Sequence, residues 1–180
     1  MALLIFAVLS LLVAGELQAG VVVGGTRFIF PADKESIAIL LTNTSQESWL
    51  INSKINRPTR WAGGEVSTVP APLLAAPPLI LLKPGTTGTL RLLRTESDIL
   101  PVDRETLFEL SIASVPSGKV ENQSVKVAMR SVFKLFWRPE GLPGDPLEAY
   151  QQLRWTRNSQ GVQLTNPTPY YINLIQVSVN

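Results

Sequence analysis

The chain has 180 residues, of which 45% are hydrophobic and only 17% charged, a composition typical of a globular protein rather than a disordered one. It contains no cysteine and no histidine, which excludes a disulfide framework, a thiol nucleophile and the commonest general base and metal ligand. The net charge of +2 comes without a dense basic patch interleaved with aromatic residues, so we expect no nucleic-acid partner.

The first 19 residues have the pattern of a secretory signal. Residues 1–15 are almost wholly apolar, and a short stretch ending at Ala19 follows them. The alternative is a membrane anchor, but the run is shorter than the ~20 residues that a spanning helix needs. No lysine or arginine precedes the run, which departs from the usual signal pattern. We nevertheless predict that residues 1–19 are a signal peptide and that the chain is exported.

Short apolar runs separated by turn residues predict a series of β-strands. The run at residues 49–55 alternates in polarity and is expected to pair with the preceding run at 36–42. Residues 66–82 hold four prolines, which lack a backbone donor, so this segment is predicted to be an edge or crossing segment. About seven short strands at regular spacing are typical of a β-sandwich. The strands are expected at residues 21–31, with a Gly-Gly break, and at 36–42, 49–55, 87–93 and 106–113.

The longest predicted strand covers residues 124–139. Its odd positions form an apolar row that only Ser131 interrupts, while its even positions include four basic residues. This alternation predicts one face against a core, and the length exceeds the usual ~5–6 residues of a strand. A long strand with a bare edge invites aggregation, so we expect a partner to pair with this edge. The apolar row is Val125, Val127, Met129, Phe133, Leu135 and Trp137, and the basic residues are Lys126, Arg130, Lys134 and Arg138.

Two loops carry residues that could support chemistry or ligand binding. Asp103 and Glu105 flank Arg104 and could form an acid–base pair, but residues two apart on a loop cannot flank a substrate bond, which favours a surface salt bridge. The loop at residues 56–64 holds Arg57, Arg60 and Trp61, a basic and aromatic cluster that is either a ligand site or a solvated loop.

A proline- and glycine-rich linker is predicted at residues 140–148. Three short strands are expected beyond it, at residues 153–156, 162–165 and 170–179, and three strands cannot bury a core by themselves. We therefore expect a first domain at residues 20–139 and, at residues 149–180, the start of a second β domain.

The motif KLFWRP at residues 134–139 resembles the K-L-[FY]-[YW]-R-P signature of the periplasmic pilus chaperones, PapD-like and of the short-loop type. Four further segments resemble the family in the same order: TRFIFP from Thr26, APP from Ala76, LPVDRETLF from Leu100 and NPTPYY from Asn166. The resemblance implies an immunoglobulin-like sandwich without enzymatic activity, cofactor, metal or small-molecule substrate. It also implies a periplasmic protein that caps pilus subunits by donor-strand complementation and delivers them, through an outer-membrane usher, for pilus assembly.

The resemblance assigns roles to five residues of the first domain. Val125, Val127 and Met129 match the alternating residues that are inserted into the subunit's incomplete fold. Arg27 and Lys134 match the basic pair that holds the subunit's terminal carboxylate, and both side chains are suitable charge-assisted donors. Without the resemblance, each cation would be interpreted as a solvated side chain.

Arg91 and Glu105 match two members of an interdomain ionic network in the family, and Ala76-Pro77 matches a frequent cis peptide. The family's second domain is about as large as its first, so the resemblance implies that residues 149–180 are a truncated domain, and we expect the chain to be an inactive chaperone. The alternative function is a secreted immunoglobulin-like adhesin or carbohydrate-binding module, for which Trp61 could supply a loop-tip aromatic residue.

Overall fold

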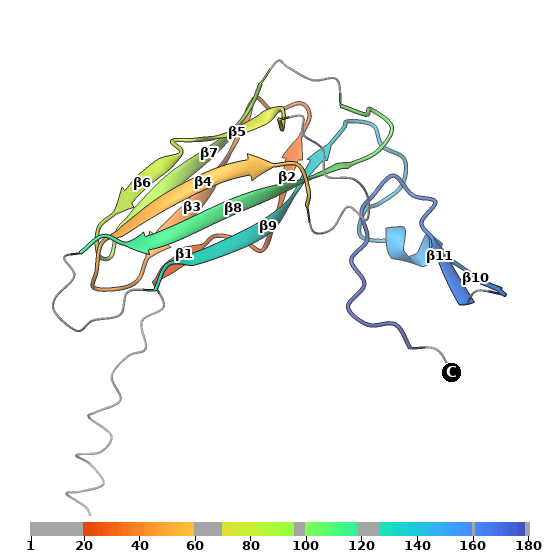
Figure 1. The fold of residues 1–180 in the computed structure, drawn as a ribbon. Coiled ribbons are helices and arrows are strands. Elements are labelled where there is room, and N and C mark those ends of the chain that lie inside the picture. Colours follow the sequence, from red (N-terminus) through yellow and green to blue (C-terminus); the bar gives the residue numbers. More distant parts are fainter. Residues whose placement is uncertain (1–19, 60–69, 96–99, 119–126, 160, 179–180) are drawn as a thin grey trace, which may run out of the picture.

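The computed structural model describes residues 20–59, 70–95, 100–118, 127–159 and 161–178, and nearly all of their regular secondary structure is β-strand (Figure 1). Two sheets pack face to face, and a smaller two-stranded hairpin lies beyond them in sequence. Within the described ranges no helix is long and apolar enough to cross a membrane. The predicted signal at residues 1–19 lies outside these ranges.

The first sheet has four antiparallel strands in the order β1-β3-β7-β5. The second has five strands in the order β2-β9-β8-β4-β6, and in it β2 and β9 run parallel. The strands of the first sheet are β1 (Val21–Val23), β3 (Ser36–Asn43), β5 (Leu73–Ala76) and β7 (Thr87–Arg94). Those of the second are β2 (Arg27–Pro31), β4 (Trp49–Asn56), β6 (Leu79–Leu82), β8 (Thr106–Pro116) and β9 (Met129–Arg138).

The core lies between the inner faces of the two sheets. Alternate residues of each strand point inward, so the period-two pattern of the sequence becomes one continuous apolar layer. Phe30 stacks on Trp137 with ring centroids 5.4 Å apart, which joins β2 to β9 on the inner side. The burial of each such Leu, Ile or Phe side chain contributes about 1.5–3 kcal/mol to the free energy of folding. The fully buried apolar residues are Phe30, Leu41, Ile51, Leu90, Leu92, Phe108, Leu110 and Leu135.

The segment at residues 21–31 is two strands in different sheets, not one. β1 pairs with β3, whereas β2 pairs with β9 in the other sheet. The change of sheet occurs at Gly24 and Gly25, where the Gly25 N–H donates to the Val23 carbonyl at 2.8 Å. A Cβ at Gly24 would lie 3.3 Å from the Leu40 carbonyl oxygen, so a residue without a side chain suits this crossing.

The proline-rich segment crosses between the sheets, as the sequence predicted. β5 belongs to the first sheet and β6 to the second, and the cis peptide Ala76-Pro77 lies between them.

The expected pairing of residues 49–55 with residues 36–42 is wrong. β3 pairs with β1 and β7, while β4 pairs with β6 and β8 in the opposite sheet. The two strands face each other across the core, where Ile39 and Ile51 belong to the same apolar cluster. Alternation predicted both strands correctly but carries no information on which sheet each one joins.

The long strand is shorter than predicted. β9 begins at Met129, residues 127 and 128 precede it without regular structure, and residues 124–126 lie outside the described ranges. Its inward residues Leu135 and Trp137 are buried in the core as expected. Phe136, on the other face, is buried as well, since its ring lies 5.4 Å from that of Tyr171.

Beyond β9 the chain forms a short 3-10 helix (Ala149–Gln152) and a hairpin of β10 (Arg154–Asn158) and β11 (Gly161–Thr165). The strand expected at residues 170–179 is absent from residues 170–178. Its backbone is used differently: the Asn166 side chain accepts from Thr168 and donates to the Tyr170 carbonyl, and the Tyr171 N–H bonds a carboxylate. These backbone groups bond to side chains, so they do not take part in strand-to-strand hydrogen bonds.

Candidate functional site

Arg27 and Lys134 lie opposite each other on neighbouring parallel strands. Arg27 of β2 is the register partner of Lys134 of β9. Because Phe28 and Leu135 pack against the core, these two cations occupy the outer face of the five-stranded sheet. Neighbouring strands are about 4.8 Å apart, so one carboxylate can contact both side chains. The structure thus brings together two residues that are far apart in sequence, and their role stays a prediction.

Lys134 is half-buried, and its Nζ donates to Oδ1 of Asn173. Arg27 is exposed. Asn173 belongs to the segment after β11, so one of the two cations already contacts the second part of the chain. The sequence did not indicate Asn173, because a local pattern does not show which distant segment a side chain will reach.

The first half of β9 has one strand partner in the part of the chain that the structure describes. β8 pairs with β9 from Met129 to Trp137, whereas β2 covers only Lys134–Arg138 on the other side. Among the described residues, none pairs with the other edge of β9 from Met129 to Phe133. Met129 is 61% exposed and Val127, just before the strand, is 62% exposed. Val125, the third residue of the predicted donor row, lies outside the described residues.

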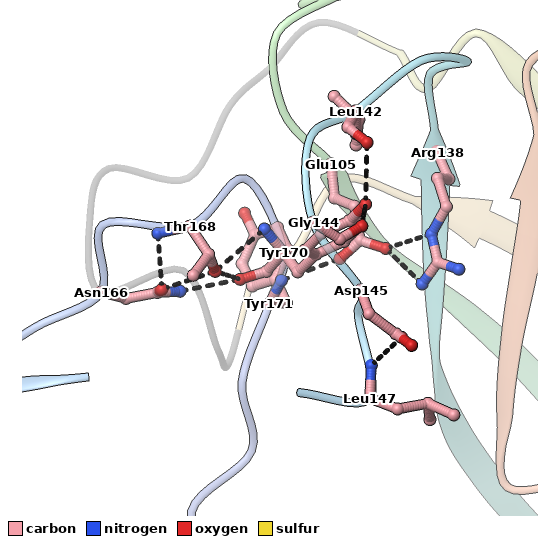
Figure 2. Close-up of polar contacts among 10 residues, drawn as sticks. All are labelled: Glu105, Arg138, Leu142, Gly144, Asp145, Leu147, Asn166, Thr168, Tyr170 and Tyr171. Atoms are coloured by element: carbon pink, nitrogen blue, oxygen red, sulfur yellow. Dashed lines mark hydrogen bonds and ion pairs between the residues drawn. The ribbon is translucent and has the colours of Figure 1, made fainter. Parts of the chain in front are cut away.

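Glu105 connects the sandwich to the second part of the chain (Figure 2). It is 4% exposed, and its Oε1 accepts from Arg138, with a shortest distance of 2.7 Å, while its Oε2 accepts from the Tyr171 N–H at 2.8 Å. The Glu105 N–H in turn donates to the Pro169 carbonyl. The Arg138 guanidinium lies over the Tyr170 ring, 5.4 Å from its centroid.

Arg91 and Glu105, predicted to share a network, lie on different elements: Arg91 is on β7 of the first sheet, and Glu105 precedes β8 of the second. Arg91 is on β7, is exposed, and donates to the Ser36 hydroxyl at 2.8 Å. The ion pair of Glu105 is with Arg138. Arg138 was not assigned a role, although its position inside the KLFWRP motif was a signal for it.

The surface salt bridge predicted for the Asp103–Glu105 loop is correct for one carboxylate and wrong for the other. Asp103 and Arg104 form an exposed ion pair at 2.6 Å, and the hydrogen bond from Arg104 lowers the pKa of Asp103. Glu105 is instead buried, and its carboxylate accepts from Arg138 and from the Tyr171 N–H. Both carboxylates are engaged with cations, which leaves no acid–base pair here.

The basic and aromatic loop is described only in part. Arg60 and Trp61 lie outside the described residues, and Arg57 lies over the Phe108 ring at 5.7 Å. No group of three or more metal-ligating residues occurs in the described ranges.

Family models cover nearly all of the chain. Residues 20–143 match the "Pili and flagellar-assembly chaperone, PapD N-terminal domain", and residues 148–180 match the "Pili assembly chaperone PapD, C-terminal domain". The chain is 98% identical to the fimbrial chaperone YcbF of Escherichia coli (strain K12) over 180 residues, which are all of this chain and 76% of the relative. It is 32% identical to the chaperone protein FimC of the same strain, over 94% of this chain and 69% of the relative.

Solved structures agree with these matches. The SafB chaperone in complex with the SafA pilin of Salmonella enterica gives a TM-score of 0.75 at 31% identity, covering 92% of this chain and 76% of that one. The E. coli chaperone DraB gives 0.74 at 28% identity, over 89% and 74%. The chain therefore belongs to the PapD family of pilus-assembly chaperones, whose members are not enzymes.

Proposed function

We propose that this protein captures pilus subunits by holding the subunit's C-terminal carboxylate between Arg27 and Lys134. The observation that carries the proposal is the register of β2 on β9, which sets the two cations side by side on one face. A carboxylate between the two side chains interacts favourably with both positive charges. Arginine can bind a carboxylate in a two-pronged geometry, and lysine adds a compact charge.

The subunit's chain then extends along the open edge of β9. Donor-strand complementation of this kind is known from chaperone–pilin complexes: main-chain hydrogen bonds supply affinity and alternate side chains supply specificity. Met129 and Val127 are exposed beside that edge, and with Val125 they would fill the hydrophobic groove of an incomplete subunit. The open stretch from Met129 to Phe133 begins directly next to Lys134, so the carboxylate anchor would set the register of the added strand.

The remaining steps rest on the family. A relative was solved in complex with a pilin, which supports pilus subunits as the partner. We infer that the chain acts in the periplasm after removal of residues 1–19 and delivers subunits to an outer-membrane usher. We also propose the division into a first domain at residues 20–139, a linker at 140–148 and a second β domain from 149. Glu105 belongs to the contact between the two domains, and a role of Arg91 in that contact stays a prediction.

The test is capture of a subunit by the Lys134→Ala variant. A tagged pilus subunit is co-expressed with the chain and recovered by affinity purification. Loss of a charge-assisted contact costs roughly 1.5–3 kcal/mol, which corresponds to about a 10- to 150-fold loss of affinity. The matched control is Lys54→Ala, because Lys54 is an exposed lysine on β4 of the same sheet. Capture by Lys134→Ala at the level of Lys54→Ala would contradict the proposal.

A further inference from the structure

A buried carboxylate lies in the same cross-strand row as the two cations. Glu109 of β8 is the register partner of Lys134, and Lys134 is the partner of Arg27. The row across the outer face therefore reads Arg27, Lys134, Glu109, and it ends at Asn56 of β4. Glu109 is 5% exposed, which is unusual for an acidic side chain.

The Glu109 carboxylate is held in place from the side away from Lys134. The Thr59 N–H donates to its Oε1 at 2.8 Å, and the Thr59 hydroxyl donates to its Oε2 at 3.1 Å. Thr59 follows the end of β4, so these bonds also fasten the start of the next loop to the sheet. A carboxylate restrained in this way cannot rotate far when another anion binds nearby.

We propose that Glu109 weakens the binding of a carboxylate at Arg27 and Lys134, so that a captured subunit can be released. This inference rests on the proposed function. A carboxylate bound between the cations would lie about one and a half strand spacings from Glu109, roughly 7–9 Å. Two like charges at that distance, at a partly exposed site, repel enough to lower affinity by about three- to tenfold.

A chaperone that must release its subunit for assembly benefits from a limited affinity for that subunit. Differences in affinity between closely related complexes appear mostly in the dissociation rate. Glu109 thus acts on how long the subunit stays bound, whereas Arg27 and Lys134 decide whether it binds.

The test is Glu109→Gln, which removes the charge but keeps an oxygen for the Thr59 N–H. The probe is a synthetic peptide of alternating apolar residues with a free C-terminal carboxylate, and its twin is the same peptide with a C-terminal amide. Calorimetry and stopped-flow kinetics measure affinity and dissociation. We expect Glu109→Gln to bind the carboxylate peptide about three- to tenfold more tightly, with slower dissociation, and to change binding of the amide less than twofold.

The matched control is Glu47→Gln, which makes the same change in net charge at an exposed site. Glu47 precedes the far end of β4, more than about 20 Å along the strand from the row, where screening removes its effect. Equal tightening by both variants, or no tightening by Glu109→Gln, would overturn the inference.

A second variant avoids the buried position altogether. Asn56 is exposed and is the register partner of Glu109, so Asn56→Lys places a counter-charge beside it. We expect about a twofold gain in affinity for the carboxylate peptide and a smaller gain when Glu109→Gln is already present. Equal gains in the two backgrounds would overturn the inference.

The result for the unaltered chain separates the two hypotheses. If that chain prefers the carboxylate peptide over the amide but Glu109→Gln does not bind more tightly, only the role of Glu109 is wrong. If the unaltered chain does not distinguish the two peptides, the carboxylate site is wrong and the inference fails with it.

Discussion

Replacing Arg138 with alanine should destabilise the protein strongly, because it leaves the Glu105 carboxylate buried without its cation. Glu105 is 4% exposed and accepts from Arg138 at 2.7 Å. Breaking a buried ion pair from one side costs about 3–5 kcal/mol. The Arg138 side chain is itself 27% exposed, which places the expected loss near the lower limit, at about 3 kcal/mol. The lost contact of the guanidinium with the Tyr170 ring adds about 0.5–1 kcal/mol.

The assay is urea unfolding followed by tryptophan fluorescence, since Trp137 is buried next to Arg138. A loss of about 3–4 kcal/mol is a large part of the ~5–15 kcal/mol that stabilises a domain. The control is Arg130→Ala, an exposed arginine of the same strand, which should change the free energy of unfolding by less than about 0.5 kcal/mol.

The double variant Glu105→Leu/Arg138→Met isolates the buried charge as the cause. It removes both charges, so it should be less destabilised than Arg138→Ala. If Arg138→Ala and Arg130→Ala lose the same stability, the ion pair between Arg138 and Glu105 does not stabilise the fold and the reasoning is refuted.

Two further predictions concern exposed residues. Val127→Asp should abolish subunit capture in a pull-down yet leave the urea midpoint unchanged, because Val127 is 62% exposed. Val102→Asp, at an 80% exposed site, is the control, and unfolding by Val127→Asp alone would show that Val127 packs inward. Arg104→Ala should raise the pKa of Asp103 measured by NMR titration, because the hydrogen bond from Arg104 lowers it. Because the pKa of Asp103 is lowered, the pair stabilises the fold above the unfolded-state pKa, and this stabilisation is lost as the pH falls through the folded-state pKa. Both residues are exposed, so acid unfolding should barely change. An unaltered Asp103 pKa in Arg104→Ala would contradict the pairing.

Local pattern was enough to predict most strands of the sandwich and part of its connections. Alternation placed Leu135 and Trp137 in the core, because the side chains of a strand point to opposite faces whatever its partners are. Prolines predicted that residues 66–82 cross or lie at an edge, because they cannot donate to a ladder. The five motifs, read as a resemblance, identified the family that the family models then confirmed.

Pairing between distant segments was decided only by the tertiary structure. Consecutive strands β3 and β4 lie in opposite sheets, and residues 170–178 form no strand, because each depends on the partners available to its backbone. The buried Glu105 illustrates the same limit, since its partners Arg138 and Tyr171 are remote in sequence.

The candidate site was likewise predicted in part from the sequence and in part known only from the structure. Alternation in the sequence predicted one strand with Arg27 near the start of the first domain and one with Lys134 near its end, and the resemblance suggested the role of both residues. Only the register of β2, β9 and β8 decided that these cations are neighbours and that Glu109 lies next to them. The physical reason is that a charge acts over a few ångströms of space, and long-range strand pairing alone determines which charges come within that distance.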